Sequence, residues 1–161
     1  MNYRKIEGEK IYLSPMDKNN EIPLLTKWFN EDESIAYNNG FISSISNEEN
    51  ISETVDKWNE SGTIFSIINK ETDEFMGHVS FFGADNNKTF ITMGIYIAEE
   101  YRGNGYGLEA IKLSTEYMFR FHVYRSIHLE VFSYNEGAYR LYQKAGFKEC
   151  GRYHNSRYFN G

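Results

Sequence analysis

Three short apolar segments that follow one another closely constrain the fold of this chain more than any other feature. They cover Thr63 to Asn69, Phe75 to Phe82 and Thr89 to Ile97, and each is rich in β-branched and aromatic residues. The connections between them contain the polar turn signals Glu71-Thr72-Asp73 and Asp85-Asn86-Asn87. Because such short connections join antiparallel neighbours, the sequence predicts three consecutive antiparallel strands.

The segment before these strands predicts one further strand and two helices. The strand, over Lys10 to Pro15, ends at a proline. Apolar residues at helical spacing indicate helices over Asn19 to Phe29 and Asn47 to Ser61, and the second helix has an asparagine cap and an acidic first turn. A polar loop, Asn30 to Ser46, joins the two helices.

The segment after the three strands alternates between helices and strands. An apolar face predicts a helix that runs to about Phe121, and a strand follows over Ile127 to Val131. Because a helix precedes this strand, a right-handed crossover places it parallel to the strand that ends at Ile97. A second helix spans Asn135 to Ala145, and a last strand runs from Phe147 toward Tyr158.

These elements form an α/β fold in the order β-α-α-β-β-β-α-β-α-β, with a mixed, mostly antiparallel sheet flanked by helices. With 161 residues, of which 40% are hydrophobic, we expect a single domain over residues 1–161. The chain ends on Asn160-Gly161, a dipeptide typical of a tight hairpin. We therefore expect a truncation at this hairpin, with the final strand missing. Otherwise the strand from Phe147 is unprotected and invites a homodimer.

Charge and composition exclude several classes of partner. The formal net charge of −6 and the pI near 5.3 argue against nucleic acid, because binding to its phosphates needs a basic surface. No segment is apolar over the ~18 residues of a membrane-spanning helix, and the N-terminus lacks the apolar stretch of a signal peptide. We expect a cytoplasmic protein with no membrane partner.

The cysteine and histidine residues of the sequence do not have the spacing of a metal site. Cys150 is the one cysteine, so an internal disulfide and a CxxC zinc site are excluded, and on a strand it is expected to be a small buried residue. The remaining histidines outside the three strands lack metal-ligand spacing: His122, His128 and His154. No metal cofactor is expected.

The run Tyr101-Arg102-Gly103-Asn104-Gly105-Tyr106-Gly107 lies between the strand that ends at Ile97 and a predicted helix. Three glycines in five positions let the backbone turn sharply and bring several N–H groups close to one anion. If the helix begins near Asn104, its free N–H groups and the positive end of its dipole point the same way. The loop therefore suits a ligand that carries phosphates.

Spacing excludes two common phosphate-binding loops. A dinucleotide fingerprint needs a third glycine where this chain has Leu108, and a P-loop needs a Gly-Lys-Ser/Thr ending that the run lacks. The pattern that remains is Arg-x-x-Gly-x-Gly, from Arg102 to Gly107.

A second block, Asn135 to Phe147, predicts a helix with two different faces. At about 100° per residue, Asn135, Ala138 and Tyr142 share one narrow face. The small side chain of Ala138 leaves room for a thin ligand, and the phenol of Tyr142 is an acid within reach of that ligand.

With these two blocks in this order, the chain resembles the GNAT superfamily of N-acetyltransferases, within the branch of ribosomal-protein N-terminal and polyamine acetyltransferases. The resemblance covers Lys10 to Gly161. It implies transfer of an acetyl group from acetyl-CoA to a primary amine by direct attack. It also implies that the pyrophosphate of acetyl-CoA is wrapped by the backbone of Arg102, Gly103, Asn104, Gly105, Tyr106 and Gly107.

The resemblance assigns roles to the other motif residues. Ile95 and Ile97 pair by main chain with the pantetheine arm, in a gap between the fourth and fifth strands. Asn135 contacts the arm beside Ala138, and Tyr142 protonates the departing thiolate. The residues alone leave Tyr142 open as a core aromatic.

Several roles stay open. Arg102 either serves the loop or has a structural role, in which it caps the strand end or pairs with Glu99 or Glu100. The base that accepts the proton of the amine is His78, Asp85 or a water chain that ends on a backbone carbonyl. A runner-up function is an acyl-CoA-binding sensor module without turnover.

The acceptor is a small-molecule amine or a peptide N-terminus, with polyamine, aminoglycoside and free amino acid all open. Acidic residues around the first two helices either attract a basic acceptor or are solvated charges: Glu31, Asp32, Glu33, Glu48, Glu49 and Glu53. In the same region, Trp28, Phe41 and Trp58 either line the acceptor pocket or pack in the core.

Overall fold

The computed structural model describes residues 6–38 and 45–156. These residues form a six-stranded sheet in the order β1-β2-β3-β4-β5-β6, with every neighbouring pair antiparallel except β5 and β6, which are parallel. The strands are β1 (Ile6–Glu7), β2 (Ile11–Pro15), β3 (Thr63–Asn69), β4 (Phe75–Phe82), β5 (Phe90–Ile97) and β6 (Ser126–His128). The helices are α1 (Lys18–Glu31), α2 (Glu33–Asn38), α3 (Glu48–Ser61), the short 3-10 turn η1 (Glu99–Tyr101), α4 (Tyr106–Phe121) and α5 (Glu136–Lys144).

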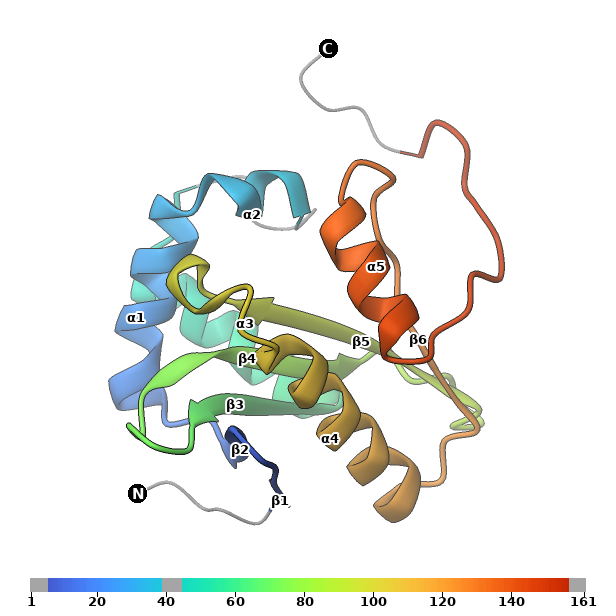
Figure 1. Ribbon diagram of the computed structural model, residues 1–161, viewed down its shortest axis with the longest axis horizontal. Coiled ribbons are helices and arrows are strands. Elements are labelled where there is room, and N and C mark those ends of the chain that lie inside the picture. The colour runs from blue at the N-terminus through green and yellow to red at the C-terminus, as the bar shows by residue number, and fades with distance from the viewer. Residues whose placement is uncertain (1–5, 39–44, 157–161) are drawn as a thin grey trace.

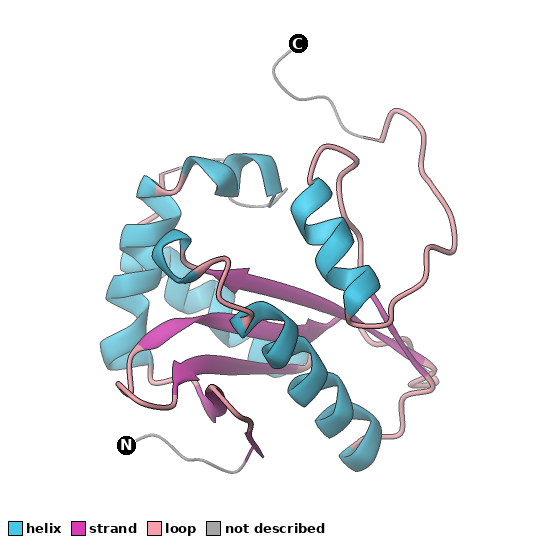
Figure 2. Cartoon of the chain, in the orientation of Figure 1, coloured by secondary structure: helices cyan, strands magenta, loops and turns pink. Residues whose placement is uncertain are grey.

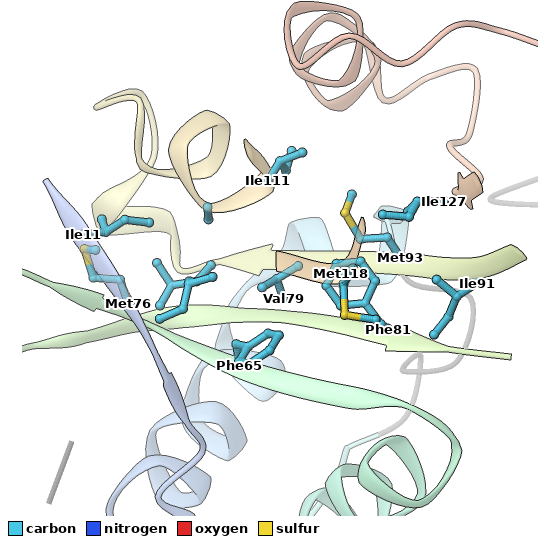
Figure 3. Close-up of a cluster of buried hydrophobic side chains, with 13 residues drawn as sticks. Ile11, Phe65, Met76, Val79, Phe81, Ile91, Met93, Ile111, Met118 and Ile127 are labelled. Atoms are coloured by element: carbon cyan, nitrogen blue, oxygen red, sulfur yellow. The ribbon is translucent and has the colours of Figure 1, made fainter. Parts of the chain in front are cut away.

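Helices cover both faces of the sheet. In Figure 1, α4 lies in front of the strands and α3 behind them, with α1 beside α3. Each face has its own apolar core. The core under α4 joins Ile111 and Met118 of the helix to Phe65, Val79 and Phe81 of the strands, as Figure 3 shows.

The second core lies under α1 and α3, where Leu25 and Val55 are fully buried. Local capping explains where these helices begin. The Asp17 side chain accepts a hydrogen bond from Asn19 N ahead of α1, and a reciprocal capping box between Asn47 and Asn50 opens α3. Both faces of the sheet are therefore buried, which agrees with the buried residues on both sides of β3 and β4.

The predicted α/β architecture and the three central strands are confirmed. β3 and β4 have the predicted bounds, and β5 begins one residue later, at Phe90. The crossover through α4 brings β6 parallel to β5, as predicted, but β6 is only three residues long and ends at His128 rather than Val131. β1 was not predicted, and α2 falls within the expected polar loop.

The predicted last strand is wrong for the residues that the structure describes. Residues 147–156 form loop and turn, which Figure 2 shows as a long excursion after α5. A strand needs a neighbour for its hydrogen bonds, and here the polar contacts are local, from Arg152 to Glu149 and from Tyr139 to Glu149. Cys150 is accordingly exposed instead of buried on a strand.

None of the helices in the described ranges is long and apolar enough to cross a membrane.

Candidate functional site

The strands β5 and β6 pair at one end only. Phe90, Ile91 and Thr92 face Ser126, Ile127 and His128, and there the pairing stops. The rest of β5 keeps β4 on one side. On its other side, no strand among the described residues adjoins Met93 to Ile97, so this part of β5 has an open edge.

Main-chain groups of Ile95 and Ile97 point to this open edge. On the closed side, Ala98 N donates a hydrogen bond of 2.9 Å to Met76 O. Alternate residues of a strand direct their N–H and C=O groups to opposite sides, so the odd-numbered residues of β5 face away from β4. The Ile97 carbonyl is already occupied, because it accepts a hydrogen bond of 2.8 Å from Arg102 Nε. Among the described residues, the N–H groups of Ile95 and Ile97 and the Ile95 carbonyl have no strand partner and are available to a ligand.

The glycine run follows directly after β5 and η1. Gly103 and Gly105 have φ angles of 80° and 85°, a region that favours glycine, and α4 begins at Tyr106, two residues later than predicted. No backbone N–H of Gly103, Asn104 or Gly105 donates to another described residue. The first N–H groups of α4 also lack acceptors within the helix. The loop and the helix start together present a set of free donors, as an anion site requires.

Arg102 holds the loop to the rest of the molecule. Besides the Ile97 carbonyl, its guanidinium donates to Ser34 Oγ at 3.0 Å and forms an ion pair with Asp32. It also lies over the Tyr96 ring, 5.8 Å from the centroid. The alternative that Arg102 caps the strand end is therefore confirmed. The other alternative, an ion pair of Arg102 with Glu99 or Glu100, is wrong, because Asp32 is the partner.

Asp32 is the centre of this cluster. Its side chain is only 7% exposed, and it accepts hydrogen bonds from Ser34 N at 2.9 Å and Tyr96 Oη at 3.2 Å in addition to the Arg102 pair. Burial opposes ionisation, but hydrogen bonds from Ser34 and Arg102 outweigh it and hold the pKa of the Asp32 carboxyl below its usual value. The ion pair therefore exists at neutral pH.

Helix α5 carries the second predicted block. Asn135 is its N-cap, since Asn135 Oδ1 accepts a hydrogen bond of 3.1 Å from Ala138 N. This bond uses one lone pair of the side-chain oxygen, and the amide nitrogen of Asn135 donates to no described residue. Close packing joins α5 to α4, because a Cβ added to Gly107 would lie 3.3 Å from Leu141 Cδ2.

Tyr142 is half-buried on α5 against the core under α4. Its ring lies edge-on to Phe147, with 6.1 Å between centroids, and in the part of the chain that the structure describes its hydroxyl has no hydrogen-bond partner. Burial raises the pKa of Tyr142 to about 12, so the phenol is protonated at neutral pH. The Tyr142 ring therefore packs against the core, as one of the two alternatives predicted. Its hydroxyl stays a candidate proton donor.

The two side chains named as candidate bases lie in different surroundings, one buried and one bound within a turn. His78 is 4% exposed among Phe29, Trp58 and Tyr96, and burial lowers its pKa to about 4, so it binds a proton poorly. Asp85 accepts three hydrogen bonds that close the turn into β5, at the opposite end of the strand from Ile97.

The predicted acidic region divides into two kinds of residue. Asp32 is buried and paired, whereas the other acids are exposed on α1, α2 and α3: Glu31, Glu33, Glu48, Glu49 and Glu53. Trp28 is 8% exposed in the core under α1, where its Nε1 donates to Glu100 Oε1 at 3.1 Å, and Trp58 packs against the same core. Phe41 lies outside the described residues.

Two polar features were missed from the sequence. Lys10 reaches the glycine loop, with 3.2 Å between Lys10 Nζ and Asn104 O. Glu21, 3% exposed on α1, accepts a hydrogen bond from Ser66 on β3, and burial raises the pKa of its carboxyl to about 7. No local motif signals either contact, because the partners are far apart in the chain. Within the described ranges, no group of three or more His, Cys, Asp or Glu residues forms a metal site.

Solved structures share this fold. The RimL ribosomal L7/L12 α-N-protein acetyltransferase in complex with coenzyme A has a TM-score of 0.85 at 15% identity, covering 97% of this chain and 90% of that one. The spermidine N-acetyltransferase from Vibrio cholerae in complex with CoA and spermine has a TM-score of 0.76 at 19% identity, covering 89% and 84%. Both belong to the branch that the sequence resembles.

Sequence comparison gives a nearer relative and a family. The SPbeta prophage-derived uncharacterized N-acetyltransferase YokL of Bacillus subtilis (strain 168) is 32% identical over 91 residues, which is 55% of this chain and half of that protein's length. The acetyltransferase (GNAT) domain matches residues 10–148, a range that includes the open edge of β5, the glycine loop and all of the second block. On that match, the chain is a member of the GNAT acetyltransferase family.

Proposed function

We propose that this protein is an N-acetyltransferase that binds acetyl-CoA and transfers its acetyl group to a primary amine. The observation that carries the proposal is that main-chain hydrogen-bonding groups follow one another without a break along the site. The open edge of β5 leads, through η1, into the glycine loop and the start of α4. An extended ligand with amides at one end and a diphosphate at the other matches this order of main-chain and anion-binding groups.

Two residues of the site, Ile95 and Tyr142, have roles in direct transfer. The amine nitrogen attacks the thioester carbonyl carbon, a C–N bond forms, and the C–S bond breaks. The N–H of Ile95 points to the edge where the carbonyl oxygen gains charge and would stabilise it. The departing thiolate takes the proton of the Tyr142 hydroxyl, which has no competing partner among the described residues.

The proton that the amine loses goes to water, and water returns a proton to the Tyr142 phenolate, which regenerates the site. The two side chains that the sequence suggested as bases are buried or committed to a turn, so a water chain is the acceptor that fits the structure best. We propose a cationic amine as the substrate class. The exposed acids of α1, α2 and α3 support this choice, as they favour the approach of positive charge to a chain of net charge −6.

Two measurements test this function. The first is the thermal shift on addition of acetyl-CoA, with ADP as the control ligand. A ligand at 100 times its Kd stabilises the folded state by about 2.7 kcal/mol, so a real site gives a clear shift. The second is thiol release with spermidine, an aminoglycoside and an N-terminal peptide as acceptors. Absence of any shift with acetyl-CoA contradicts donor binding, and binding without turnover on every amine contradicts the transferase assignment.

A further inference from the structure

The glycine loop has a cation beside it that comes from the other end of the chain. Lys10 directly precedes β2, and its ammonium donates to the Asn104 carbonyl at 3.2 Å. A Cβ added to Gly105 would lie 3.8 Å from Lys10 Nζ, which places the ammonium next to the residue that caps α4. The charge therefore lies beside the glycine loop, at the Asn104 carbonyl and close to Gly105.

The backbone of Lys10 is fixed on two sides. Its N–H donates at 3.0 Å to Glu109 Oε1, in the first turn of α4, and its carbonyl accepts a hydrogen bond of 2.9 Å from Lys70 N. The ammonium itself forms no ion pair with a described residue, and its bond to Asn104 uses one of its three donors. By contrast, the neighbouring Lys70 ammonium is paired with Glu7 at 2.9 Å.

The arginine of the loop cannot supply this charge. The Arg102 guanidinium is occupied by Asp32, by Ser34 Oγ and by the Ile97 carbonyl. A protein of net charge −6 that binds a polyanion needs a local cation at the phosphates, because the overall field is repulsive. Lys10 is placed to provide it.

We propose that Lys10 binds a phosphate group of coenzyme A and its acetyl ester. This inference rests on the proposed function, since it names a residue for the same donor site. Either the diphosphate or the 3′-phosphate offers the required chemistry, oxygen anions that accept N–H bonds from an ammonium. The hydrogen bond from Lys10 to Asn104 also holds the glycine loop in place before the ligand binds.

The test compares binding of coenzyme A and of dephospho-CoA, which lacks the 3′-phosphate, by isothermal titration calorimetry. The variants are Lys10→Gln, which removes the charge, Lys10→Arg, which keeps it, and Lys70→Gln as the matched control. We expect Lys10→Gln to raise the Kd for coenzyme A about tenfold at low salt, the size of one charge-assisted hydrogen bond. The difference from wild type should shrink at 300 mM salt, and Lys10→Arg should restore most of the affinity.

The two ligands identify the phosphate. An equal loss with both ligands assigns Lys10 to the diphosphate, whereas a loss with coenzyme A alone assigns it to the 3′-phosphate. A Kd for Lys10→Gln equal to that of Lys70→Gln overturns the inference and leaves the proposed function intact. If Lys10→Arg binds as weakly as Lys10→Gln, the contact to Asn104 is only structural and the inference is again overturned. Failure of the wild-type protein to bind either ligand overturns the inference and the proposed function together.

Discussion

The ion pair between Asp32 and Arg102 is expected to stabilise the fold more than an exposed ion pair does. The Asp32 side chain is 7% exposed and the Arg102 side chain 37% exposed, and the carboxylate has further partners in Ser34 and Tyr96. A hydrogen bond to a charged group contributes about 1.5–3 kcal/mol. Because Arg102 is partly exposed, solvent screening reduces that figure, and we expect a coupling energy of about 1–2 kcal/mol.

A double-mutant cycle with equilibrium urea unfolding measures this energy. The variants are Asp32→Asn, Arg102→Met and the double substitution. The control is the same cycle on Glu136 and Arg140, an ion pair on α5 whose side chains are 71% and 70% exposed and for which about 0.3–0.5 kcal/mol is expected. A coupling at Asp32 no larger than the coupling of the control would refute the reasoning.

The pH dependence of the same cycle gives a second check. The pKa of the Asp32 carboxyl is lower in the folded protein than its usual value, so the folded state binds fewer protons than the unfolded state in acid. The stability from the pair is therefore complete above the usual carboxyl pKa and is lost as the pH falls through the lowered pKa. If the coupling energy stays the same at the lowest pH at which the protein is still folded, the charge of Asp32 is not the source of the coupling.

Three further predictions concern single residues. Tyr142→Phe should lower kcat by about 10²- to 10⁴-fold while the Kd for acetyl-CoA stays the same, and unchanged steady-state turnover would remove Tyr142 from the mechanism. Burial raises the pKa of Glu21 to about 7, so the folded state holds a proton that the unfolded state releases, and stability should fall as the pH rises from 4.5 to 7. Glu21→Gln should flatten that slope in urea unfolding across this range, and a slope equal to that of wild type would contradict the assignment. Gly105→Ala, at a φ of 85°, should cost about 1 kcal/mol and weaken acetyl-CoA binding in calorimetry, whereas Gly151→Ala in open space should do neither.

Local patterns in the sequence were sufficient to predict two central strands and the helix after the glycine run. β3 and β4 have the bounds that their β-branched and aromatic residues and the turn residues predicted, and the helix after the glycine run begins within two residues of its expected start. The last strand failed for a physical reason. Residues 147–156 include no β-branched residue, and a strand forms only against a neighbour, whose presence the order of residues does not reveal.

The candidate site was predictable only where it depends on local backbone geometry. The glycines that require positive φ and the N-cap at Asn135 follow from residues near them in the chain. The partner of Arg102 and the approach of Lys10 to Asn104 depend instead on contacts across 70 and 94 residues. Such contacts leave no periodic trace in one sequence, so the sequence suggested Glu99 and Glu100 as the nearest acids and missed Asp32.

The open edge of β5 implies an unusual tolerance to substitution at the centre of the site. Under the proposed function, the N–H groups of Ile95 and Ile97 and the Ile95 carbonyl bind the donor, while the side chains of both residues pack against the core under α4. Any apolar residue that fills the same space presents the same main-chain groups. Selection on donor binding is therefore expected to act on the shape of these two side chains rather than on their chemistry, and relatives can diverge here without losing the donor.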